Sequence, residues 1–174
     1  MNIAWASSRV LGSDLCSTSQ INLANGLVDR GHNVMFFSPG NTNGLRFKHI
    51  PIQQSKIRGL QARSIRKNLI HKIGELNQAD VVLLDWTLWK LSRRINKPTI
   101  LIDRSPPANS GFLVKLQWGP WRKAWSKANK GTTVSPAHRQ FVVNHSQTSE
   151  ESIHVIPAGV DLELFQPTKK EGPI

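Results

Sequence analysis

The sequence has 174 residues, enough for one domain, and 39% of them are hydrophobic, which excludes a disordered chain. The single cysteine, Cys16, excludes an internal disulfide framework and a cysteine-rich zinc site. The net charge is +12, no apolar run approaches the roughly 18 residues of a membrane-spanning helix, and the first residues form no secretory signal. We therefore expect a globular, basic, cytoplasmic protein.

Short apolar runs alternate with helical periodicities along the chain, which predicts an α/β fold with a Rossmann-like, doubly wound, mostly parallel sheet. The longest helical pattern covers residues 55–76, where Ile57 and Leu60 belong to an apolar stripe that should face the core. Ser135 and Pro136 suit an N-cap and a first helical residue, and predict a helix to about Asn144. The expected strands are residues 2–6, 34–37, 47–52, 80–85, 98–103, 132–134 and 153–156, with a further helix over 14–30.

The positive charge is confined to the middle of the chain. Residues 55–130 hold 16 basic and 4 acidic residues, so this block carries the whole excess. Such a block indicates either a solvated charged face or an acidic partner: nucleic acid, an anionic membrane or a phosphorylated substrate. The residues expected to face that partner are Lys56, Arg58, Arg63, Arg66, Lys67, Trp118, Arg122 and Lys123.

Candidate site residues follow the predicted strands, because an open parallel sheet binds ligands at the carboxyl ends of its strands. The polar loop Ser7–Ser13 precedes a helix N-terminus, which favours an anion. Asp85 ends another strand and equally suits the cap of a following helix, while Arg104 can keep Asp103 ionised and hold a phosphate. The candidates are Ser8, Gly12, Ser13, Asp85, Trp86, Asp103, Arg104, Ser105, Ser135 and Gly159.

Histidines and tryptophans give weaker signals. His138 and His145 lie seven residues apart, which is not a metal-ligand spacing on a helix, and we expect no metal. Trp121 and Trp125 lie four apart and either pack inward or, with nearby Lys and Arg, face a membrane interface or nucleic acid.

Two segments carry a more specific resemblance. The first joins Met1-Asn-Ile-Ala-Trp5 to Ile21-Asn-Leu-Ala-Asn-Gly-Leu-Val-Asp-Arg-Gly-His-Asn-Val34. The second joins Thr133-Val-Ser-Pro136 to Ile153-His-Val-Ile-Pro-Ala-Gly-Val-Asp161 and Phe165-Gln-Pro167. In order and spacing, these segments resemble the N-terminal half of the GT-B retaining glycosyltransferases of the family 4 type.

The resemblance implies an acceptor-binding, Rossmann-like domain over residues 1–165 and the start of an interdomain linker over 166–174. The absent C-terminal domain would bind most of the nucleotide-diphosphate sugar, the co-substrate, and no tightly bound cofactor is expected. The full-length enzyme would be a retaining hexosyltransferase, and this chain alone would be inactive. The basic block, rather than the resemblance, indicates either a phosphorylated or lipid-linked acceptor or an anionic membrane surface, with the protein then peripheral on the inner face of the membrane.

The sequence departs from the family pattern at three positions. Only Gly12 stands in the first loop, where the family usually has a glycine pair, and Ala158 replaces an Asn. Asp103 stands where many members have a His near the transferred sugar, which makes it the catalytic candidate. We expect Asp103→Asn and Arg104→Ala to reduce activity with little loss of stability.

Two alternatives from other classes remain open. A basic α/β nucleic-acid-binding module would explain the charge but not the Ile-Pro-Ala-Gly-Val-Asp segment, so nucleic acid is the disfavoured partner. The N-terminal half of a GT-B sugar-nucleotide epimerase would share the fold and would act without any acceptor.

Overall fold

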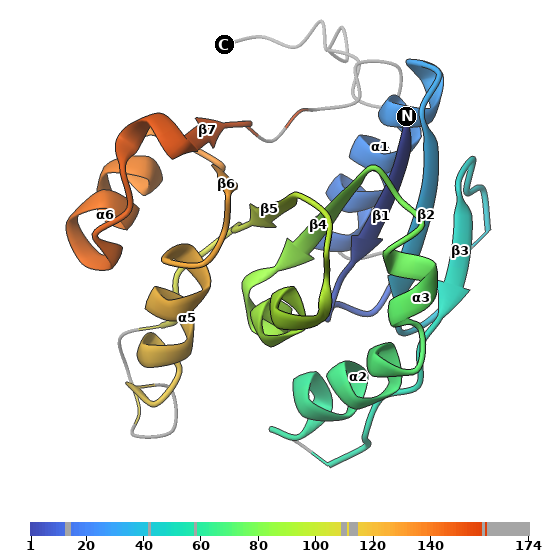
Figure 1. Cartoon of the computed structure of the whole chain (residues 1–174), viewed down its shortest axis with the longest axis horizontal. Coiled ribbons are helices and arrows are strands. Elements are labelled where there is room, and N and C mark those ends of the chain that lie inside the picture. The colour runs from blue at the N-terminus through green and yellow to red at the C-terminus, as the bar shows by residue number, and fades with distance from the viewer. Residues whose placement is uncertain are drawn as a thin grey trace, which may run out of the picture.

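The computed structural model describes residues 1–12, 15–41, 43–57, 59–108, 111, 115–157 and 159, with the side chains of residues 15 and 16 left out (Figure 1). In this part of the chain, seven strands form one sheet in the order β3-β2-β1-β4-β5-β6-β7, and every neighbouring pair is parallel. This confirms the predicted fold class. The strands are β1 (Asn2–Ala6), β2 (Asn33–Ser38), β3 (Lys48–Pro51), β4 (Val81–Asp85), β5 (Thr99–Ile102), β6 (Lys130–Thr133) and β7 (Ile153–Val155).

Helices cover the two faces of the sheet unequally. Side chains alternate between faces along a strand, so Ile3 and Trp5 pack with α1, whereas Ala4 and Ala6 pack with the helices of the opposite face. Among the described residues, α1 is the one helix on its face, and it lies over the β1 and β2 half of the sheet (Figure 1). The helices are α1 (Leu15–Asp29), α2 (Gln61–Ile70), α3 (Ile73–Leu76), η1 (Trp86–Arg94), α5 (Trp118–Trp125), α6 (Pro136–Ser146) and η2 (Glu150–Ser152).

The strand order reverses between β1 and β4, and this reversal positions the site. From β1 the chain moves outward through β2 to β3, then returns to β4 on the other side of β1. The carboxyl ends of β1 and β4 lie side by side, with Ala6 paired to Leu84. The loops that follow them diverge there and leave a crevice, as doubly wound folds do.

The loop after β1 is fixed to the end of β2 by a close backbone approach at Gly40. Leu11 N–H donates to Pro39 O over 2.9 Å. Gly40 has φ +85°, and a Cβ there would lie 2.6 Å from the Leu11 carbonyl oxygen. A glycine is therefore required at this position, because both the backbone angle and the space exclude a side chain.

The helix expected over residues 55–76 is shorter and divided. The helical segments are α2 and α3, and α2 begins only at Gln61, after Gly59 adopts φ +88°. The prediction that the apolar stripe faces the core was therefore wrong at its start, because Ile57 is 63% exposed and Leu60 is 41% exposed. The helices η1 and α5 were not expected, whereas the start of α6, with Ser135 as N-cap and Pro136 at N1, is confirmed.

Helix α5 packs on the sheet through a glycine in β6. The ring of Trp125 is almost fully buried, and a Cβ built on Gly131 would lie 2.1 Å from its Cζ3 atom. Gly131 therefore leaves the space that the indole fills.

We predict that Gly131→Ala lowers the free energy of unfolding by about 1–3 kcal/mol, because the added methyl group overpacks the site of Trp125. Gly119→Ala is the matched control, since no atom lies within 4 Å of a Cβ built there in α5. The control should be neutral or stabilising by up to about 1 kcal/mol. Urea unfolding of the two variants measures the difference, and equal stability would contradict this packing.

Candidate functional site

The loops after β1, β4 and β5 enclose a hollow of about 260 Å³ at the carboxyl edge of the sheet, here called the switch-point pocket. It brings together five predicted residues: Ser8, Asp85, Trp86, Arg104 and Ser105. The full lining is Ser8, Arg9, Gln20, Asp85, Trp86, Thr87, Ile102, Arg104, Ser105, Pro106, Pro107, Ala108 and Gln117.

Asp85 connects the two loops that meet at the reversal. Its Oδ2 accepts hydrogen bonds from Ser7 Oγ at 2.7 Å and from the Ser8 N–H at 3.0 Å. The hydroxyls of Ser8 and Thr87 lie 2.6 Å apart and join the same two loops again. Asp85 does precede η1, but its side chain caps no helix N–H and instead binds the first loop.

Burial raises the pKa of Asp85 above its usual value, since desolvation disfavours the carboxylate. The hydrogen bonds from Ser7 and Ser8 and the positive charges of Arg9 and Arg104 lower it in turn, without cancelling the rise. The pocket therefore pairs one partly buried carboxyl group with two guanidinium groups and several hydroxyls. Such a lining suits a polar ligand that carries negative charge.

Gln20 is a pocket residue that sequence reasoning missed. Its side chain is 1% exposed, and Nε2 donates to Ser7 Oγ over 3.2 Å. Gln20 lies between Ser17 and Ala24 on the buried stripe of α1. A polar residue within that stripe, just after the first loop, was the signal that could have identified it.

The other predicted cleft residues do not line this pocket. Gly12 N–H donates to Ser17 Oγ over 2.8 Å, so Gly12 helps to fix the start of α1. Ser135 Oγ accepts the His138 N–H at 3.1 Å, which gives Ser135 a helix-capping role. Ser13 lies outside the described residues.

Gly159 lines a second hollow, of about 410 Å³, between α1 and the half of the sheet that α1 leaves uncovered. Trp5 and Leu23 border this groove on one side, and Thr132 and Ile156 on the other. Arg104 lines both hollows and so connects the groove with the switch-point pocket.

The structure corrects the interpretation of Asp103. Its side chain has no exposed surface, and Oδ2 accepts the indole N–H groups of Trp121 at 2.6 Å and Trp125 at 2.9 Å. His138 Nε2 of α6 lies 3.6 Å from the same oxygen, and Oδ1 accepts the Ser105 N–H. The carboxylate therefore holds α5 against the sheet. Asp103 also borders the groove of about 410 Å³, but its side chain has no exposed surface there.

The tryptophans of α5 pack inward. Trp121 and Trp125 are buried, so the reading in which they pack into the core is confirmed. Trp118 is half-buried, with its ring 5.5 Å from Trp121 and 5.9 Å from Phe141 of α6, so part of its surface remains exposed. Arg58, another residue expected to face an acidic partner, lies outside the described residues.

The described residues contain neither a group of His, Cys, Asp and Glu side chains arranged for a metal ion nor a helix long and apolar enough to cross a membrane.

Sequence comparison places most of the chain in one family. The sequence model described as Glycosyltransferase Family 4 matches residues 17–164. A search of curated protein sequences finds no match.

Solved structures share the fold at low identity. HepE of Anabaena in complex with UDP-glucose has a TM-score of 0.67 and 12% identity, over 96% of this chain and 47% of that one. WaaG, a glycosyltransferase involved in lipopolysaccharide biosynthesis, has a TM-score of 0.68 and 15% identity, over 91% of this chain and 45% of that one. A UDP-N-acetylglucosamine 2-epimerase has a TM-score of 0.59 and 11% identity, over 89% of this chain and 47% of that one. The chain spans less than half the length of each, and the resemblance drawn from its motifs is confirmed for family and fold.

We predict that Asp103→Ala lowers the free energy of unfolding by about 2–5 kcal/mol, because it leaves the buried indole N–H groups of Trp121 and Trp125 without an acceptor. Asp29→Ala removes an exposed carboxylate paired with exposed Arg46 and should cost under about 1 kcal/mol. Chemical denaturation followed by tryptophan fluorescence measures both. An Asp103 variant as stable as the parent would return this residue to the list of catalytic candidates.

Proposed function

The chain belongs to glycosyltransferase family 4, and on this premise we propose that it is the acceptor-side domain of a retaining enzyme that uses a nucleotide-diphosphate sugar. We assign this domain to residues 1–165 and an interdomain linker to residues 166–174, which lie outside the described part of the chain. The donor would be held mainly by a second domain. The neighbouring HepE structure, which contains UDP-glucose, supports this class of donor.

One observation carries the proposal: the switch-point pocket collects polar and charged side chains from three separate loops. Ser8 follows β1, Asp85 ends β4 and Thr87 follows it, and Arg104 and Ser105 follow β5. Hydroxyl and guanidinium groups that converge at this edge can bind sugar hydroxyls and phosphate oxygens together.

The proposed transfer breaks the bond between the sugar C1 and the diphosphate oxygen, and joins C1 to an acceptor hydroxyl oxygen. The acceptor proton leaves with the departing diphosphate, which takes the bonding electron pair. In this scheme Asp85 is a positioning residue, because its hydrogen bonds hold the Ser7–Ser8 segment in place. Arg104 binds the anionic group of a phosphorylated or lipid-linked acceptor.

Epimerisation of a sugar nucleotide is the second candidate function. A UDP-N-acetylglucosamine 2-epimerase shares this fold over 89% of the chain. The two activities differ in what they require: an epimerase acts on the sugar nucleotide alone, whereas a transferase also needs an acceptor. The family assignment favours transfer.

We predict that the purified chain alone turns over no UDP-sugar above background hydrolysis, because the donor would be held by another domain. Chromatography of UDP-glucose and UDP-N-acetylglucosamine after incubation measures both release of UDP and formation of an epimer. Release of UDP by the chain alone would contradict the division between acceptor and donor domains. An epimer formed without an acceptor would establish the second candidate instead.

In the full-length enzyme, Arg104→Ala should lower kcat/KM for a phosphate-bearing acceptor by about 10- to 100-fold, since one hydrogen bond to a charged group is lost. Arg30→Ala is the matched control, because Arg30 is exposed and does not line the pocket. The acceptor KM and kcat are measured separately at fixed donor. Equal values for the two variants would remove Arg104 from the site.

A further inference from the structure

Three helices on one face of the sheet carry basic residues and no acidic residue. They are α2, η1 and α5, whose sequences are QARSIRKNLI, WTLWKLSRR and WGPWRKAW. Helix η1 lies between the other two and contacts both. We call their charged surface the basic layer; its residues are Arg63, Arg66, Lys67, Lys90, Arg93, Arg94, Arg122 and Lys123.

The acidic residues of the surrounding block 55–130 do not neutralise this layer. Glu75 pairs with Lys72 at 2.8 Å, and Asp80 accepts the Asn2 N–H at the opposite edge of the sheet from the pocket. Asp85 binds the first loop, and the Asp103 carboxylate is buried against α5. Eight basic residues of the block therefore lie on three neighbouring helices that carry no acidic residue.

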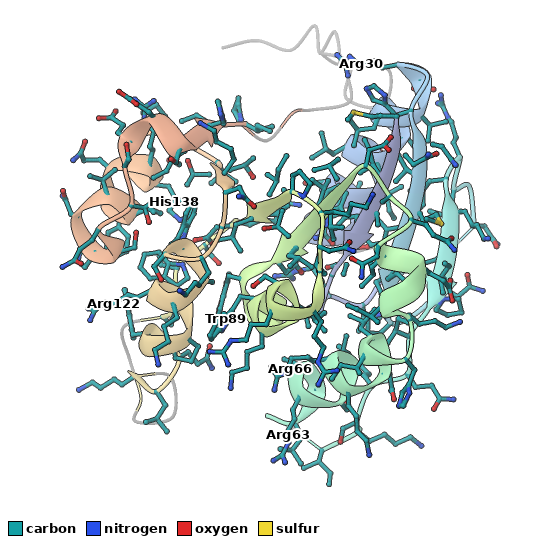
Figure 2. All side chains as sticks on the ribbon, in the orientation of Figure 1. Arg30, Arg63, Arg66, Trp89, Arg122 and His138 are labelled. Atoms are coloured by element: carbon teal, nitrogen blue, oxygen red, sulfur yellow. The ribbon has the colours of Figure 1, made fainter. Side chains whose placement is uncertain are left out.

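Like charges stand close together within the layer. Arg63 and Arg66 both line a hollow of about 510 Å³ beside Lys67 on α2. Partial burial, followed by repulsion from Arg63, lowers the pKa of the Arg66 guanidinium. In Figure 2, Arg63 and Arg66 lie together, Arg122 lies on the other side of Trp89, and Arg30 is at the upper edge. An arrangement of unneutralised cations costs stability unless an anionic surface compensates it.

Exposed aliphatic side chains accompany these cations. Ile57 is 63% and Leu60 41% exposed just before α2, and Leu116 is 61% exposed just before α5. Large apolar side chains beside Lys and Arg are typical of surfaces that enter the headgroup region of a bilayer. Binding to single-stranded nucleic acid instead uses exposed aromatic platforms. On η1 and α5, Trp89, Trp121 and Trp125 are buried, and Trp86 and Trp118 are only partly exposed.

We propose that the basic layer docks on an anionic lipid bilayer, with its lysines and arginines against the phosphate groups and Ile57 and Leu60 inserted at the interface. This docking is separate from sugar transfer and does not depend on it. Its place in the fold is nevertheless relevant to the pocket, because Trp86 and Thr87 at the start of η1 line the pocket while Arg93 and Arg94 end the same helix. The pocket would then open close to the membrane surface.

The test is sedimentation of the purified chain with vesicles of phosphatidylcholine, with and without 30% phosphatidylglycerol, at about 0.1 M and 1 M salt, where the screening length falls from about 10 to 3 Å. We expect binding to anionic vesicles at low salt, and loss of that binding at high salt. Arg63→Gln, Arg66→Gln and Lys67→Gln together should weaken binding on the order of 100-fold, from about fivefold for each charge. Ile57→Ser with Leu60→Ser should weaken binding with no change in charge.

The matched control removes three charges outside the layer: Arg30→Gln, Lys48→Gln and Lys130→Gln. A second layer variant, Lys90→Gln, Arg94→Gln and Lys123→Gln, guards against a fold defect in α2, and thermal unfolding checks each variant. Equal binding to neutral and anionic vesicles, or an equal loss in the control, would overturn the proposal. So would a chain that binds duplex or single-stranded DNA through the same residues but leaves vesicles in solution. None of these results bears on turnover of a sugar nucleotide, which tests the proposed function separately.

Discussion

The hydrogen bonds from the first loop to Asp85 join the two halves of the molecule. A parallel sheet that reverses its strand order has two loops leaving in opposite directions at the reversal, and nothing in the sheet ladder fixes one relative to the other. Ser7 Oγ and the Ser8 N–H bind Asp85 Oδ2 across that gap, and Gln20 supports Ser7 from α1. The geometry of the pocket therefore depends on one half-buried carboxylate whose ionisation is opposed by burial and favoured by its donors.

A second carboxylate, that of Asp103, fixes a structural element on the other face of the sheet. Asp103 receives two indole N–H groups and so fixes α5, which in turn packs against α6 and η1. The two aspartates both end or follow central strands, yet one opens toward the pocket and the other turns into the core. Their side chains differ in direction because successive residues of a strand point to opposite faces.

The fold was predictable from the sequence because strands such as residues 80–85 are nearly continuous apolar runs, as is typical of parallel strands covered on both faces. Grouping of Ser8, Asp85, Arg104 and Ser105 also followed from the strand-end rule. The role of Asp103 did not, because its partners Trp121 and Trp125 come from a helix that the sequence pattern did not predict. The exposed position of Ile57 was missed for a similar reason: the periodicity continued across Gly59, where the backbone leaves the helical region.

The acid-free composition of α2, η1 and α5 gives salt two opposing effects on this protein. Added ions screen the repulsion between neighbouring cations, and so favour the folded chain when it is free in solution. The same ions compete with any anionic surface that the cations would bind. An anionic partner and added salt thus each reduce the same repulsion between cations. An anionic partner therefore raises the melting temperature most where the ionic strength is lowest.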